Sequence, residues 1–241
     1  MDSIKDFCGG FHEKGWKCRV AIILAILVLG FFAIGLPLLL TPGDVSPECE
    51  DTSTMSKKSR QVVLDEHNDY RSRAAKGEFK IANEDSKLKV LPPATRMPML
   101  KYNCTLENRS LKWAYTVQCA MKHSGQGENI FAIGGHYSAE QVAETAVKAW
   151  TDEISQHGLS GLDQWARNVG HATQVLWAAT ESVGCGVVQC DNGNTMAVCQ
   201  YHPIGNYWGK PVYKAGKTLS ECGSGGRKEV KNETTGLCQL L

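Results

Sequence analysis

Cysteine content constrains this 241-residue chain more than any other feature. Of its ten cysteines, Cys8 and Cys18 precede a long apolar run, and the other eight follow it: Cys49, Cys104, Cys119, Cys185, Cys190, Cys199, Cys222 and Cys238. The number is even, and no spacing gives the paired C-x-x-C pattern of a zinc site, so the cysteines favour a disulfide framework. Such frameworks are typical of oxidising, extracytoplasmic compartments.

The apolar run at residues 20–40 carries no charged residue and is long enough to cross a membrane as a helix. Four basic residues precede it, and the next one after it is Lys57. An excess of basic residues marks the cytoplasmic side of a membrane. We therefore expect residues 1–19 to form a cytoplasmic tail and residues 20–40 a type II signal anchor. A cleaved signal peptide and a secreted product are the alternative.

The rest of the chain divides by composition. Residues 41–58 are polar and contain two prolines, which is typical of a stalk, and residues 223–241 begin with a glycine-rich stretch typical of a loose tail. Residues 59–222 remain as the globular domain. The net charge of +1 gives no electrostatic reason to expect a nucleic-acid partner.

Three N-glycosylation sequons agree with an exported domain. Their acceptor residues are Asn103, Asn108 and Asn232, each followed two positions later by Ser or Thr. The sequence therefore predicts a glycoprotein.

A β-hairpin is predicted near the middle of the cysteine-rich part. Residues 182–190 and 195–202 have strand composition and flank an Asp-Asn-Gly turn signal. A three-residue loop there would place Cys185 opposite Cys199. Cys190 is an odd number of residues from Cys185, so its side chain should leave the other face and find another partner.

Helical segments surround this hairpin. Apolar residues recur with helical spacing in four segments: residues 59–76, 106–121, 138–157 and 170–178. Ser138 and Gln141 form a capping-box pair at the start of the third segment. Helices interleaved with antiparallel strands predict an α+β sandwich.

Seven short motifs then occur in a characteristic order. They are LDEHNDYR at 64–71, KHS at 122–124, GENI at 127–130, WTDEI at 150–154, GHATQVLW at 170–177, VGC at 183–185 and CQYHPIGNY at 199–207. In this order they resemble the CAP superfamily, also called SCP/TAPS, which includes cysteine-rich secretory proteins, venom allergens and pathogenesis-related proteins. The chain is most similar to single-domain, venom allergen-like nematode members. The resemblance implies an α-β-α sandwich with a central antiparallel sheet.

The resemblance also implies a site. The family's two His and two Glu that line a cleft fall here on His123, Glu128, Glu153 and His171. In the family the imidazoles can hold a divalent cation, often zinc, and the carboxylates act through water or hydrogen bonds. Neutral imidazole suits zinc, and a required physiological metal is not expected.

Two disulfides are implied by the resemblance, and two follow by elimination. The implied pairs are Cys119–Cys190 and Cys185–Cys199, and the second agrees with the hairpin register. Cys104–Cys222 and Cys49–Cys238 then remain.

Three functions are compatible with these residues. The first, which we favour, is a non-catalytic extracellular binding protein for lipid, sterol or protein ligands. The alternative is a metal-dependent hydrolase or protease in which Glu128 or Glu153 is the general base. Two His are fewer than the three protein ligands usual for catalytic zinc, so no catalytic residue is assigned. The third is a surface glycoprotein with a coating role.

Overall fold

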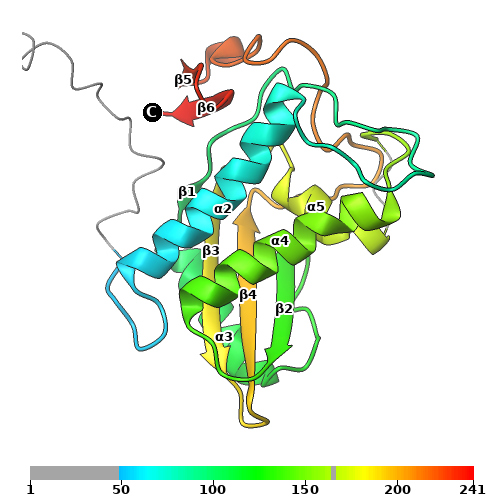
Figure 1. Ribbon diagram of the computed structural model, residues 1–241. Helices are drawn as coiled ribbons and strands as arrows, with labels where there is room; N and C mark the ends of the chain where they lie inside the picture. Colours follow the sequence, from blue (N-terminus) through cyan, green and yellow to red (C-terminus); the bar gives the residue numbers. More distant parts are fainter. Residues whose placement is uncertain (1–48, 164–166) are drawn as a thin grey trace, which may run out of the picture. The chain divides into compact units, whose positions relative to one another are not determined.

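The computed structural model describes residues 49–163 and 167–241 (Figure 1). The predicted cytoplasmic tail and signal anchor at residues 1–40 lie outside the described residues. Within the part that is described, no helix combines the length and apolarity needed to span a membrane.

A four-stranded sheet forms the centre of the domain, in the order β1-β3-β4-β2. Its strands are β1 (Lys101–Tyr102), β2 (Glu128–Gly134), β3 (Ser182–Gln189) and β4 (Asn194–His202). The β2–β4 and β3–β4 pairs are antiparallel, but β1 pairs with β3 in parallel. The expected antiparallel sheet is confirmed for β2, β3 and β4, and the two-residue β1 makes the sheet mixed. A parallel pair needs a long crossover, and the chain between β1 and β3 supplies one.

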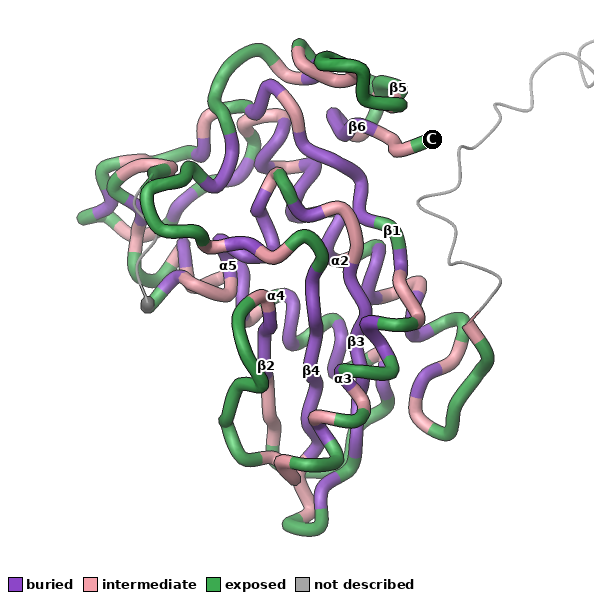
Figure 2. Tube along the Cα trace, turned by 180° about the vertical axis from the view of Figure 1, so that it is seen from behind, coloured by how far each residue is buried: buried purple, intermediate pink, exposed green. Residues whose placement is uncertain are grey.

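Helices cover both faces of the sheet. Helices α2 (Lys57–Lys76), α4 (Ala139–His157) and α5 (Gly170–Val175) lie on one face, with the short η2 (Arg167–Val169) before α5, and α3 (Cys104–Val117) covers the other (Figures 1 and 2). One apolar core lies between the sheet and the first group, and a smaller core lies under α3. The predicted α+β sandwich and its four helices are confirmed.

Helix α3 ends four residues earlier than its apolar spacing predicts. Gln118 and Cys119 both have left-handed backbone conformations, with φ of 46° and 62°. This double turn ends the helix at Val117 and brings Cys119 to its disulfide partner Cys190, which directly follows β3.

The hairpin has the predicted register. Cys185 lies opposite Cys199, and the two are joined by a disulfide with a Cα–Cα distance of 4.1 Å. Gly193 closes the loop with φ of 79°, a conformation that favours glycine. The Cys190 side chain was predicted to lie on the opposite face of the hairpin from Cys185. Its disulfide bond to Cys119 confirms this prediction.

The two pairings reached by elimination are wrong. Cys49 is bonded to Cys104, and Cys222 is bonded to Cys238. The first pair forms because the buried Arg60 binds both the segment after Cys49 and Glu107, one turn into α3. These contacts bring the N-terminal segment to the start of α3.

The C-terminal segment is ordered, which corrects the expected loose tail at residues 223–241. A short turn, η3 (Ser224–Gly226), leads into an antiparallel pair, β5 (Glu229–Asn232) and β6 (Leu237–Leu240). Cys238 is fully buried and exchanges backbone hydrogen bonds with the 97–99 segment. The Cys222–Cys238 bond closes this segment onto itself, so the folded unit extends to the end of the chain.

The predicted stalk at residues 41–58 also needs correction. Residues 41–48 lie outside the described residues, but residues 49–58 are part of the domain. Met55 is fully buried and Ser56 caps α2 with a capping box.

Candidate functional site

The four side chains of the predicted tetrad converge from four different elements. His123 lies in the loop after α3, Glu128 begins β2, Glu153 lies on α4, and His171 lies on α5. The imidazole centroids of His123 and His171 are 6.1 Å apart. The structure therefore brings together residues that are up to 48 positions apart in sequence, as two His/Glu pairs.

The first pair is built around a buried carboxylate. The Glu128 side chain is 1% exposed, and its Oε1 accepts hydrogen bonds from His123 Nδ1 at 3.1 Å and from the Ser124 backbone N–H at 2.9 Å. Its Oε2 accepts from the Ser124 hydroxyl and from Gln200 Nε2 at 3.2 Å. Both carboxylate oxygens of Glu128 are thus engaged by protein donors.

The second pair has the same design. Glu153 Oε1 lies 2.6 Å from His171 Nδ1, and its Oε2 accepts from the backbone N–H groups of His171 and Ala172 at 3.0 and 3.2 Å. The Trp150 ring stacks on His171 with a centroid distance of 6.2 Å. Glu153 therefore fixes both the ring and the first turn of α5.

Each imidazole binds its Glu through Nδ1, which leaves Nε2 for another ligand. Among the described residues, no hydrogen bond engages Nε2 of His123 or of His171, and these side chains are 48% and 30% exposed. A carboxylate on one ring nitrogen is the usual outer-shell partner of a metal-binding His. Nε2 is therefore the ring nitrogen that each imidazole has available for a further ligand.

Another cluster has the composition of a metal site within the described part of the chain. Cys222, Glu229 and Cys238 have their ligand atoms close together. The two cysteines are disulfide-bonded, so neither is a thiolate. Glu229 instead accepts hydrogen bonds from Arg96 and from the Gly223 backbone N–H. This cluster is structural.

A buried hydrogen-bond network connects α2 to the tetrad. His67 Nδ1 lies 2.7 Å from the Val63 carbonyl, so this nitrogen is the protonated one and Nε2 accepts from the Tyr201 hydroxyl at 2.9 Å. Asn129 Nδ2 donates to Tyr201 and, with its other hydrogen, to the His171 carbonyl, both at 3.1 Å. Every donor has one acceptor, and the network ends at a residue of the tetrad.

This network requires a neutral His67. The residue is fully buried, and burial is the main reason why its pKa is lowered to about 4. The charge of Arg71 lowers this pKa further, and the hydrogen bond to Val63 opposes the shift.

Sequence reasoning found the tetrad but missed its supports. Gln200, Ser124 and Asn129 lie inside the quoted motifs, where no role was assigned to them. Gln200 faces Glu128 in the β2–β4 register, and that non-local pairing was the missing signal. The predicted hairpin fixed only β3 against β4.

Comparison with known proteins gives the same assignment. A family model described as "CAP: Cysteine-rich secretory protein family" matches residues 64–201, more than half of the chain. The chain belongs to the CAP family. All four tetrad residues lie inside the matched region.

Individual CAP relatives agree with this assignment. The chain is 32% identical to Ancylostoma secreted protein from Ancylostoma caninum over 83% of its own length, but spans only 49% of that protein. It is 30% identical to venom allergen 5 from Vespa velutina, covering 67% of this chain and 83% of the allergen. A crystal structure of NaASP2 with Zn²⁺ superposes with a TM-score of 0.68 and 33% identity, covering 79% of this chain and 99% of that one.

Proposed function

We propose that this CAP domain is a non-catalytic extracellular binding protein whose cleft binds a divalent cation through His123 and His171. One observation carries the proposal: each imidazole has its Nδ1 bound to a Glu that other donors also hold, and its Nε2 is left without a described partner. Carboxylates in this position orient a ring and raise its basicity toward a metal. The solved relative whose description includes Zn²⁺ adds support from outside the chain.

The same geometry argues against the alternative of a metal-dependent hydrolase. A general base must reach the proton that it abstracts. Glu128 is 1% exposed and accepts hydrogen bonds on both oxygens, and Glu153 is 19% exposed and also accepts on both. Protein donors hold both oxygens of each carboxylate, so we assign both as positioning residues.

We further propose that exposed loops of the domain recognise lipid, sterol or extracellular protein ligands. The loop after β4 exposes 50% of Tyr207 and 87% of Trp208, and exposed aromatic groups of this size are typical of interaction sites. Secretion or anchoring through residues 20–40 and glycosylation at Asn103, Asn108 and Asn232 belong to this proposal.

Zinc titration by calorimetry tests the cation site. We expect one site in the unaltered protein, its loss in His123→Ala and His171→Ala, and about ten- to hundredfold weaker binding in Glu128→Gln and Glu153→Gln. His136→Ala is the matched control, because His136 is exposed on a loop outside the tetrad. Zinc affinity unchanged in His123→Ala and in His171→Ala would refute the assignment.

A second measurement separates binding from catalysis. A panel of peptide and ester substrates is incubated with the zinc-loaded protein and with the Glu128→Gln variant. Neither protein is expected to hydrolyse any substrate of the panel. Turnover that disappears in Glu128→Gln would establish the hydrolase instead. Binding of a lipid, sterol or protein ligand that no tetrad substitution weakens would indicate that another part of the domain recognises this ligand.

A further inference from the structure

The outer edge of β3 presents backbone groups that the described residues do not pair. An antiparallel strand bonds its neighbour through alternate residues. The bond from the Cys190 N–H to the Asn194 carbonyl, at 2.8 Å, fixes which residues these are. Val188 therefore bonds to β4, and the N–H and C=O groups of Val187 and Gln189 point to the opposite edge.

Contacts farther along the strand confirm this alternation. The Val183 carbonyl accepts from the Asn103 N–H at 2.9 Å, on the side away from β4. The Cys185 carbonyl accepts from the Tyr102 hydroxyl at 3.0 Å, on the same side. The carbonyl groups that point away from β4 therefore have partners at Val183 and Cys185. At the next two positions, Val187 and Gln189, the described residues supply no partner.

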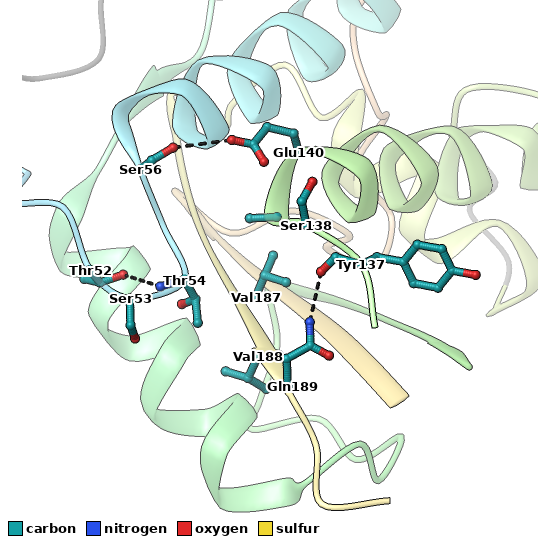
Figure 3. Close-up of a pocket in the computed structure, with 11 residues that line it drawn as sticks. Thr52, Ser53, Thr54, Ser56, Tyr137, Ser138, Glu140, Val187, Val188 and Gln189 are labelled. Atoms are coloured by element: carbon teal, nitrogen blue, oxygen red, sulfur yellow. Dashed lines mark hydrogen bonds between the residues drawn. The ribbon is translucent and has the colours of Figure 1, made fainter. Parts of the chain in front are cut away.

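A pocket of about 330 Å³ lies beside these two residues (Figure 3). Its walls are residues 52–56, residues 137–140 at the start of α4, and β3 itself. The Tyr137 ring points away from the pocket in Figure 3, whereas its carbonyl accepts from Gln189 Nε2 at 2.9 Å. The Gln189 side chain is therefore occupied, and its backbone has no hydrogen-bond partner among residues 49–163 and 167–241.

The chemistry of the pocket selects among ligands. Val187 is 3% exposed, and buried backbone groups without partners are costly. A ligand that offers a donor and an acceptor at strand spacing recovers both bonds, and an extended peptide does this. The Thr52 and Ser56 hydroxyls already bond to Met55 and Glu140. The hydroxyls of Ser53, Thr54 and Ser138, which also line the pocket, can donate to such a peptide.

The charge of the pocket further restricts which ligands it can bind. Among the residues that line the pocket, Glu140 is the one with a charged side chain. A hydrogen bond from its own backbone N–H, at the start of α4, lowers its pKa, so the carboxylate is ionised at neutral pH. An ionised carboxylate disfavours an anionic ligand and favours a basic side chain.

We propose that this edge pocket binds an extended peptide that carries a basic side chain. The peptide adds to β3 as a further strand by pairing with the backbone of Val187 and Gln189, and its basic group lies against Glu140. This surface differs from the His/Glu cleft, because it lies beside the other end of β3 and β4. The proposal therefore stands independently of the cation site.

NMR titration of the full chain, as produced and isotopically labelled in yeast, tests the proposal. The probe is the blocked peptide Ac-Lys-Val-Lys-Val-Lys-Val-Lys-NH₂. We expect saturable shifts and at least about tenfold slower hydrogen exchange for the Val187 and Gln189 amides. The Val188 amide is the internal control, because it is already bonded to β4 and should change little.

Two controls separate strand pairing from other modes of binding. Methylation of two consecutive central nitrogens blocks both edges of the peptide and should weaken binding at least about tenfold. Glu140→Gln should weaken binding of the lysine peptide about two- to fivefold, while Glu144→Gln, an exposed position one turn along α4, should not.

Three results would overturn the proposal. One is the absence of saturable shifts at Val187 and Gln189. Another is equal binding of the methylated peptide, which would exclude backbone pairing. The third is binding of chitotriose but not of the peptide, which would make the pocket a carbohydrate site.

Discussion

Acid should destabilise this domain through one buried histidine. The pKa of His67 is about 4 in the folded protein, against an ordinary value of 6.5. The unfolded chain therefore binds a proton at this residue more readily than the folded chain does, and stability falls as the pH drops from 6.5 to 4. Each unit of pKa difference corresponds to about 1.4 kcal/mol. The free energy of unfolding should decrease by about 2 kcal/mol between pH 7 and pH 5, and by about 3 kcal/mol at pH 4.

Urea denaturation at pH 7, 6, 5 and 4, followed by tryptophan fluorescence, measures this loss. The comparison protein is His67→Gln, in which the side chain can still accept from Tyr201 but cannot titrate. This variant is expected to be less stable at neutral pH and to lack the His67 component of the pH dependence. Parallel stability profiles for the two proteins would show that His67 is not the titrating group and would refute the reasoning.

Three further predictions concern stability and location. Arg60→Met removes the buried partner of Glu107, whose Oε2 lies 2.8 Å from Arg60 Nε, and should cost about 3–5 kcal/mol in the free energy of unfolding by urea; a loss below 1 kcal/mol would contradict it. Cys222 and Cys238 are 16 positions apart, and replacing both by Ser should lower the free energy of unfolding by about 3 kcal/mol and expose the C-terminal strands to limited proteolysis. An unchanged digestion pattern would contradict the ordered C-terminal segment. A C-terminally tagged full chain made in eukaryotic cells should be glycosidase-sensitive and remain in the membrane fraction, because residues 20–40 have the length and apolarity expected of a signal anchor; a secreted product that begins just after this run would establish a cleaved signal peptide.

The features predicted correctly from sequence are those that local chemistry determines. The β3–β4 register follows from a three-residue turn, and the Cys185–Cys199 bond follows from that register. The start of α4 follows from the Ser138 capping box. In each case the interacting residues are close in sequence, so the pattern itself contains the information.

The incorrect predictions concern contacts between distant segments. The parallel pairing of β1 joins residues about 80 positions apart, and the Cys49–Cys104 bond joins residues 55 positions apart, beside the buried Arg60 that binds Glu107. No local pattern records these contacts. The C-terminal segment was misjudged because its glycine-rich start resembles a linker, whereas Cys238 anchors its end in the fold.

The candidate site shows the same division. The tetrad residues were found through motifs, but the role of Gln200 at Glu128 required the β2–β4 register. The network from His67 to His171 spans α2, β4 and β2, so it became visible only once the elements were assembled.

Anomalous diffraction at the zinc edge, from crystals of the zinc-loaded protein, tests the central claim most directly. We predict a zinc peak bound by Nε2 of both His123 and His171 at about 2.0–2.1 Å, with Glu128 and Glu153 on the opposite ring nitrogens. Zinc bound directly by either carboxylate, or bound away from the two imidazoles, would contradict the assignment of the carboxylates as positioning residues.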